Sequence, residues 1–361
     1  MLEENGLAGY YFDWLEHPDD DEYWRQWRIE AHHERITIPV LAFGGWYDMF
    51  LRGTLRNFLG LRERGGSEEA RTGQRLIIGP WAHGKPLFGP NPDPAISFGL
   101  EGTAFDVEGL SVRWFDYWLK GIDNRVLDET PAVTVFTLGE NRWRQLADWP
   151  VPGTQWVDYY LHDAGRLSTE PPAEEPADVY LYDPRRPVPT VGGPAYGDGG
   201  ARDQRAVESR PDVLVYTSEP LAADVRVTGP IAMRLWAETT ARDTDFTAKL
   251  VNVAPDGLAM NLADGIVRAR YRNGQTEPQL VEPGTVVEYT IDLDAASNVF
   301  RAGHRIRVEV SSSNFPRFDA NPNTGGIFGE DGVGVAALQT VHHSSARPSH
   351  ITLPVIPVET S

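Results

Sequence analysis

The sequence has 361 residues, of which 41% are hydrophobic and 24% charged, a composition that excludes a wholly disordered chain and, at roughly 150 residues a domain, indicates two or three domains. Lysine and arginine number 33 against 52 aspartates and glutamates, giving a net charge of −19; we therefore expect no nucleic acid and no anionic membrane as partner, because both need a positive surface. The absence of cysteine excludes disulfides, thiolate metal sites and a cysteine nucleophile.

The first residues and the apolar runs bear on localisation. Residues 1–6 include two glutamates and do not resemble a signal peptide. No apolar run reaches the ~18 residues of a membrane span. We therefore expect a cytoplasmic protein.

Residues 1–38 have a helical pattern. The acidic run at 19–22 is typical of a helix start, where negative charge favours the helix dipole. Aromatic residues then recur at helical spacing, at Tyr23, Trp24 and Trp27. We predict that this stripe packs against another element; the alternative is that it lines a substrate pocket.

Residues 36–125 alternate between strand and helix patterns. The expected elements are a buried strand at 38–43 ended by two glycines, an amphipathic helix at 50–63, a second buried strand at 75–78 stopped by Gly79-Pro80, and a helix at 106–119 capped by Gly121. This order predicts one end of an α/β sheet. Four elements are too few for a complete doubly wound domain.

From about residue 130 the apolar period changes to two. Strand patterns occur at 133–138, 157–161, 231–236, 246–251, 286–291 and 306–310, many of them separated by turn signals such as Asn273-Gly274. Many short strands with turns between them predict a β-sandwich of the jelly-roll type. Residues 162–210, rich in Pro, Gly and Asp, predict an irregular excursion over it.

Two short segments place titratable residues just after the two predicted parallel strands. Asp48 follows the first strand and His83 follows the second, at the sheet edge where α/β active sites are built. An aspartate followed 35 residues later by a histidine matches the last two members of a Ser…Asp…His triad on an α/β-hydrolase sheet. The alternatives are a turn aspartate and a structural histidine.

These segments also carry a family resemblance. Gly-Gly-Trp-Tyr-Asp-Met-Phe at 44–50 and Gly-Pro-Trp-Ala-His at 79–83 resemble the acid and base motifs of the cocaine esterase / X-Pro dipeptidyl-peptidase (CocE/NonD) family of serine hydrolases, which includes α-amino acid ester hydrolases and glutaryl-cephalosporin acylases. Further matching segments lie at 113–121, 180–184, 243–250 and 311–319. The resemblance extends over nearly all of residues 10–355.

The resemblance implies an α/β plus all-β fold in three parts. These are the end of a helical cap at 1–35, the C-terminal part of an α/β-hydrolase domain at 36–130, and a jelly-roll β-sandwich at 131–361. It implies an esterase, acylase or dipeptidyl-peptidase with no cofactor.

The resemblance also implies roles for residues in the two motifs. Asp48 matches the triad acid, His83 the triad base, and Phe50 a position that lines the acyl pocket. Trp46, Tyr47 and Trp81, from the same motifs, are predicted to contact the substrate, a small-molecule or short-peptide acyl compound.

The family's nucleophile motif, Gly-x-Ser-x-Gly, does not occur in this sequence. The nearest string, around Ser97, comes after His83 and follows no buried strand, and the serines at 311–313 fit a strand end. The family's oxyanion donors precede the acid and base as well. We therefore expect the C-terminal part of a longer serine hydrolase, inactive alone, whose partners are the missing N-terminal half and possible further copies of the chain.

Two other functions stay open. The β-sandwich could be a binding module for carbohydrate or a protein partner, and the chain could be one half of a split hydrolase that a second chain completes. Trp143, Trp149 and Trp156 could form a sugar-stacking platform, although we favour packing. We expect the pairs His32-His33 and His342-His343 to be surface residues, residues 319–325 not to bind calcium, and no metal.

Overall fold

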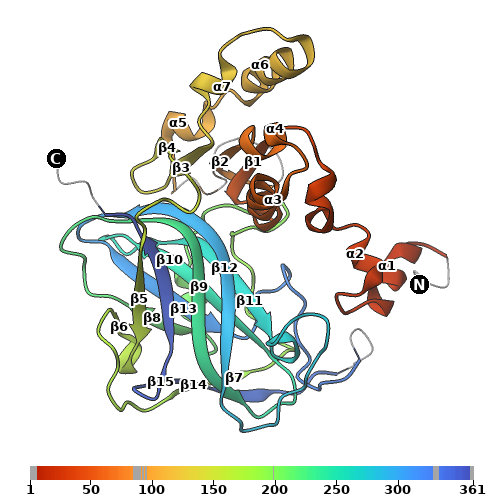
Figure 1. The fold of residues 1–361 in the computed structure, drawn as a ribbon. Coiled ribbons are helices and arrows are strands. Elements are labelled where there is room, and N and C mark those ends of the chain that lie inside the picture. Colours follow the sequence, from red (N-terminus) through yellow and green to blue (C-terminus); the bar gives the residue numbers. More distant parts are fainter. Residues whose placement is uncertain are drawn as a thin grey trace.

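Three parts follow one another along the chain in the computed structural model, which describes residues 6–83, 91, 93, 96–197, 199–327 and 333–357 (Figure 1). Short helices come first, a small sheet with its helices follows, and a large β-sandwich ends the chain. This is the predicted combination of α/β and all-β parts. None of the helices in these ranges is long and apolar enough to cross a membrane.

The N-terminal helices are α1 (Gly9–Glu16), α2 (Glu22–Arg25) and the 3-10 helix η2 (Ile29–Arg35). Asp21 caps α2, as the acidic run predicts, by accepting a 3.0 Å hydrogen bond from the amide of Tyr23. Trp24 packs against α1 as predicted, with its ring 6.3 Å from that of Trp14, whereas the prediction is wrong for Trp27, which is 72% exposed. The amide of Asp20, which bonds to the carbonyl of Gln275 at 2.9 Å, helps to tie this segment to the sandwich.

The small sheet has the order β1 (Leu41–Tyr47), β2 (Arg75–Ala82), β3 (Val133–Thr137) and β4 (Arg142–Leu146). Its first three strands are parallel and β4 is antiparallel. The accompanying helices are α3 (Leu51–Arg64), α4 (Glu68–Thr72), α5 (Gly99–Thr103), α6 (Val107–Lys120) and α7 (Val126–Glu129).

The glycines that were expected to end the strands lie inside them. A side chain at Gly44 would come within 2.9 Å of Ile78, and one at Gly45 within 2.2 Å of the carbonyl oxygen of Trp81. Glycine therefore permits close approach of β1 and β2, and both strands run on to the start of the loops that carry the titratable residues.

Two strands after residue 131, where the sandwich was expected to start, belong to the first sheet. β3 pairs with β2 and β4 pairs with β3, so the first sheet continues to Leu146. Every residue of β3 is buried, as in a parallel strand covered on both faces. The first strand of the sandwich begins at Gln155. Alternation of apolar residues in the sequence predicts a strand but does not determine which sheet the strand joins.

The predicted β-sandwich is confirmed. One sheet has the order β11-β10-β13-β8, and an eight-stranded sheet has the order β15-β14-β9-β16-β5-β6, with β12 beside β9 and β7 beside β14. Alternate residues of β9, from Ile231 to Ala237, point into the common core. The bounds are β5 (Gln155–Leu161), β6 (Leu167–Ser168), β7 (Asp178–Tyr182), β8 (Leu214–Thr217), β9 (Val225–Thr239), β10 (Asp245–Val253), β11 (Ala259–Arg268), β12 (Val287–Phe300), β13 (Arg305–Ser311), β14 (Ala337–Ser344), β15 (Arg347–Pro348) and β16 (His350–Val355).

Helix α6 stands away from the sandwich at the far end of the molecule (Figure 1). Gly121 ends it in the left-handed conformation, at φ 67°, as predicted. Of its apolar residues only Trp114 is buried, whereas Val112, Phe115 and Leu119 are 56–77% exposed. Such an apolar stripe is typical of a surface that another segment covers.

Candidate active site

Asp48 lies in the short turn between β1 and α3. Its amide donates to the carbonyl of Gly45 at 3.0 Å, and its Oδ1 accepts a 2.8 Å hydrogen bond from the amide of Phe50. The carboxylate therefore sits at the N-terminus of the 14-residue helix α3, where the helix dipole stabilises negative charge.

His83 directly follows β2, the strand beside β1. Its Nδ1 lies 3.3 Å from Oδ2 of Asp48, so the predicted proximity of the two side chains is confirmed. Asp48 is 16% exposed and His83 31% exposed. When Nδ1–H donates to the carboxylate, the neutral imidazole presents a lone pair on Nε2, which can accept a proton.

Two aromatic rings flank the imidazole of His83. Phe50 meets it edge to face at a centroid distance of 4.9 Å, and the ring of Tyr196 lies 6.0 Å away. Both rings are exposed, Phe50 by 59% and Tyr196 by 77%. Phe50 was expected here, whereas Tyr196 was not, because it belongs to the excursion at 162–210 and is more than 100 residues away in sequence.

A hollow of about 520 Å³ adjoins Tyr196, one of the two aromatic residues that flank His83. We call it the Tyr196 hollow. The sandwich loops contribute most of its wall, and Met49, next to Asp48, contributes the rest. Arg317, the charged residue of the wall, is paired with Asp264. The lining residues are Met49, Thr190, Gly192, Pro194, Ala195, Tyr196, Pro316, Arg317 and Phe318.

The expected substrate contacts of three motif residues are corrected. Trp46, Tyr47 and Trp81 are at most 3% exposed. Their polar atoms donate to backbone carbonyls, Trp46 to Phe136 at 2.6 Å, Tyr47 to Asn261 at 3.0 Å and Trp81 to Gly102 at 3.0 Å. These side chains hold the strand ends in the core, and their faces are unavailable to a substrate.

The serines singled out in the sequence have structural partners. Ser97 is exposed in a loop, and its hydroxyl oxygen accepts from the amide of Gly99 at 3.2 Å. Ser311 donates to the carbonyl of Asp212, Ser312 bonds to the Tyr180 hydroxyl, and Ser313 accepts from the amide of Val188. None of these contacts involves His83.

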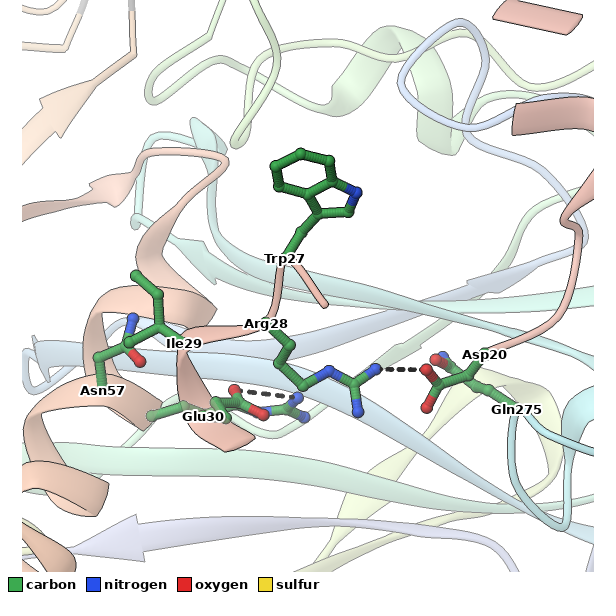
Figure 2. A pocket seen from close by; sticks show the side chains of 8 residues that line it. Asp20, Trp27, Arg28, Ile29, Glu30, Asn57 and Gln275 are labelled. Carbon is green, nitrogen blue, oxygen red and sulfur yellow. Dashed lines mark hydrogen bonds and ion pairs between the residues drawn. The ribbon is translucent and has the colours of Figure 1, made fainter. Parts of the chain in front are cut away.

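A second hollow, of about 470 Å³, lies between the N-terminal segment and α3 (Figure 2). Its charged groups pair with one another: Arg28 with Asp20 at 2.6 Å, and Arg56 with Glu30 at 3.9 Å. The indole of Trp27 is directed away from these pairs. Because these charged side chains are paired with one another, the lining of this hollow does not indicate acid–base catalysis.

The three tryptophans do not form one platform. Trp149 is 4% exposed, and Trp143 packs against an aromatic cluster that includes Phe105 at a centroid distance of 4.4 Å, as the packing interpretation predicts. Trp156 is 53% exposed. A sugar-stacking site built from all three is thus not supported.

Two histidines that were expected at the surface are buried instead. His33 is fully buried between Asn57 and Arg64, with ring nitrogens 3.0 Å from each. His343 is also fully buried. Among the described residues, no group of three or more His, Asp or Glu side chains is arranged to hold a metal ion.

His343 belongs to a cluster of titratable groups in the sandwich, in which His343 and His162 are buried and Glu175 and Asp178 are half-buried. Its Nε2 lies 3.0 Å from Asp178 and its Nδ1 3.4 Å from Glu175, which in turn contacts His162 at 3.0 Å. Burial alone would lower the pKa of His343, but the two carboxylates outweigh it and the pKa is raised. Burial would raise the pKa of Asp178 and of Glu175, but the histidine hydrogen bonds outweigh it and lower both.

This cluster predicts a pH-dependent stability. A raised histidine pKa stabilises the fold below the unfolded value of about 6.5 and is lost as pH rises through the folded value, whereas the lowered carboxyl pKa values stabilise above about 4.5. We expect His343→Gln to reduce the free energy of unfolding by about 1–3 kcal/mol at pH 6, with a smaller loss at pH 8.5. Urea unfolding at both pH values measures it, with His32→Gln as control; a loss that does not depend on pH would contradict the assignment.

Family models match both ends of the chain. Residues 124–352 match the X-Pro dipeptidyl-peptidase C-terminal non-catalytic domain, and residues 2–85 match X-Pro dipeptidyl-peptidases of the S15 family. The chain belongs to the X-Pro dipeptidyl-peptidase family. The C-terminal match includes β3 and β4, although these strands pair within the first sheet.

Two proteins with curated sequences are similar to nearly the whole chain. Cocaine esterase from Rhodococcus sp. is 40% identical over 376 residues, which cover 98% of this chain and 64% of the esterase. A putative serine esterase from Mycobacterium bovis is 28% identical over 362 residues, which cover 92% of this chain and 52% of that protein. The chain thus spans between half and two thirds of the length of these relatives.

Solved structures show the same fold. An aminopeptidase from a marine sediment Thaumarchaeota archaeon superposes with a TM-score of 0.88 at 29% identity, covering 99% of this chain and 62% of the aminopeptidase. A selenomethionine-labelled α-amino acid ester hydrolase superposes with a TM-score of 0.86 at 28% identity, covering 98% of this chain and 61% of the hydrolase. Both are named as hydrolases of ester or peptide bonds.

Proposed function

We propose that this chain carries the acid and the base of a serine hydrolase that cleaves ester or amide bonds by a Ser-His-Asp mechanism. The observation that supports this is the contact of 3.3 Å between Nδ1 of His83 and Oδ2 of Asp48, formed at the ends of two adjacent parallel strands. The sequence similarity to esterases and X-Pro dipeptidyl-peptidases agrees with it.

In the proposed mechanism Asp48 holds the imidazole in the Nδ1–H tautomer and stabilises the imidazolium that forms. His83 Nε2 takes the proton of a serine hydroxyl as the serine oxygen attacks the acyl carbon, and then gives that proton to the leaving alcohol or amine. The resulting acyl-enzyme is hydrolysed by water, which His83 deprotonates in turn.

We further propose that the nucleophile comes from a polypeptide segment outside these 361 residues. The sequence lacks the Gly-x-Ser-x-Gly motif, and Ser97 and the serines at 311–313 have the structural contacts described above. The exposed stripe of α6 would suit such a segment. So would β1, which is an edge strand of its sheet in the described part of the chain.

The surroundings of His83 favour substrates with an apolar or aromatic group. Phe50 and Tyr196 present exposed rings to the imidazole, and the Tyr196 hollow adds Met49, Pro316 and Phe318. The charge of Arg317 in its wall is neutralised by Asp264. An uncharged ester or amide fits this environment better than an anionic one.

The chain alone is expected to show no hydrolysis above background. Without a nucleophile the covalent step is absent, and each missing oxyanion donor costs about 3 kcal/mol of transition-state stabilisation. Hydrolysis of p-nitrophenyl esters and aminoacyl-proline anilides by the purified chain measures this. Turnover that a serine-directed inhibitor abolishes would overturn the proposal that the nucleophile lies elsewhere.

A complementation experiment tests the rest of the proposal. The chain is co-expressed with the portion of the Rhodococcus cocaine esterase that it does not span, and in a second arm the two are fused. Activity in either arm that disappears when the serine of the added segment is replaced by alanine supports the proposal. Activity only from separate chains would favour a split hydrolase, and a folded complex inactive on every substrate would contradict the proposal.

A further inference from the structure

We propose that a bulge in the sandwich strand β12 positions the catalytic acid, by holding Arg52 in the first turn of α3 through Asp292 and Asp294. This inference rests on the proposed function, because it concerns the orientation of Asp48 toward His83. Under this inference the sandwich helps to arrange the site, although it matches a domain described as non-catalytic.

A register shift, a left-handed residue and a local hydrogen bond define the bulge, and a glycine on another strand leaves room for it. The register between β12 and β9 shifts between Asp292 and Ala295. Asp294 adopts φ 60°, in the left-handed region that residues other than glycine rarely occupy, and its amide donates to Oδ1 of Asp292 at 2.9 Å. On β11, a strand of the other sheet, a side chain at Gly265 would lie 2.1 Å from the carbonyl oxygen of Asp292. Bulges of this kind redirect side chains and are common next to active sites.

The bulge presents two acceptors and a carboxylate to one guanidinium group. Arg52 Nε donates to Oδ1 of Asp294, and its Nη2 donates to the carbonyl of Asp292 at 3.2 Å and lies 3.6 Å from the Asp292 carboxylate. A cation in the first turn of a helix is on the unfavourable side of the helix dipole. The position of Arg52 is therefore explained by its contacts with the sandwich rather than by the charge preference of helix α3.

The first turn of α3 is joined directly to the carboxylate of Asp48. The amide of Leu51 donates to the backbone carbonyl of Asp48 at 3.0 Å, and the amide of Phe50 donates to its Oδ1 at 2.8 Å. A movement of Arg52 relative to the sandwich would therefore move this carboxylate. The contact of 3.3 Å with His83 is already long for a hydrogen bond, so a shift of a few tenths of an ångström would weaken it.

A second contact between the small sheet and the sandwich holds the other side of the turn that carries Asp48. The hydroxyl of Tyr47, the last residue of β1, donates to the carbonyl of Asn261 on β11 at 3.0 Å. Asp48 thus lies between two points that are fixed to the sandwich, Tyr47 and Arg52. Asp294 is 13% exposed, and its carboxylate would be costly to leave there without Arg52.

The tautomer of His83 in the purified 361-residue chain tests this inference without an activity assay. Nitrogen-15 spectra of histidine-labelled protein, recorded above the titration range of imidazole, distinguish Nδ1–H from Nε2–H, and His83→Gln assigns the signal. We expect Arg52→Gln and Asp294→Asn each to reduce the ratio of Nδ1–H to Nε2–H about fivefold, as weakening one hydrogen bond would. Arg62→Gln, further along α3 and paired with Asp148 rather than with the bulge, is the matched control and should leave the ratio unchanged.

The outcomes separate this inference from the proposed function. If Asp48→Asn changes the wild-type tautomer ratio but the folded Arg52 and Asp294 variants do not, the positioning role is overturned and the catalytic pair stands. If Asp48→Asn has no effect on the ratio, the pair itself fails. Arg52→Lys keeps the charge but loses the planar guanidinium, so its tautomer ratio should lie between those of Arg52→Gln and the wild type. If Arg52→Gln only destabilised the fold, it would lower the free energy of unfolding and leave the tautomer ratio of the folded protein unchanged.

Discussion

In the enzyme completed with a nucleophile segment, Asp48→Asn is expected to lower kcat by about 10⁴-fold for an ester substrate. An asparagine amide that donates to Nδ1 of His83 favours the Nε2–H tautomer. In this tautomer Nε2 carries a hydrogen and has no lone pair to accept the serine proton. Oδ2 of Asp48 lies 3.3 Å from Nδ1 of His83, so the substitution acts directly on the proposed orienting contact. KM should change little, because Asp48 is only 16% exposed.

Steady-state kinetics with a p-nitrophenyl ester measure this effect. Asp224→Asn, whose carboxylate pairs with Arg301 on the surface of the sandwich, removes a similar charge and should leave kcat unchanged. His83→Ala should reduce kcat at least as much as Asp48→Asn. A loss of less than tenfold in Asp48→Asn, with folding intact, would remove Asp48 from the proposed mechanism.

Gly45→Ala is expected to lower the free energy of unfolding by about 3 kcal/mol. The new methyl group would lie 2.2 Å from the carbonyl oxygen of Trp81 and 2.8 Å from its carbonyl carbon. Both are backbone atoms of β2, so β1 and β2 must separate to accommodate it. The same change would displace the Gly45 carbonyl that accepts from the amide of Asp48.

Urea unfolding followed by tryptophan fluorescence measures this loss of stability. Gly53→Ala is the matched control, because nothing lies within 4 Å of its added carbon and it occupies the interior of α3; it should stabilise the protein by about 0.5–1 kcal/mol. If Gly45→Ala were as stable as the wild type, the close approach of the two strands would not be required.

Local patterns in the sequence predict the elements around the site well. The apolar runs that become β1 and β2 place Asp48 and His83 at one sheet edge, because parallel strands end together, and the structure brings these side chains into contact. Their catalytic role stays a proposal. The capped ends of α2 and α6 could also be predicted, since caps depend on residues adjacent in the chain.

Features that depend on distant contacts could not be predicted in this way. Trp46 and Trp81 were expected to face substrate because they flank the titratable residues, but each is held in the core by a carbonyl from another part of the chain. Tyr196 reaches His83 across more than 100 residues. His343 carries no local sign of Asp178, its partner on another strand.

The presence of β3 and β4 in the same sheet as β2 has a practical consequence for recombining members of this family. A chimera joined at residue 130 would take β2 from one parent and its neighbour β3 from the other, so that every contact between them would be new. A crossover at Pro152-Gly153, in the exposed turn before β5, leaves each sheet with the strands of a single parent. Exchange of sandwiches between homologues should therefore yield more folded proteins from the later junction.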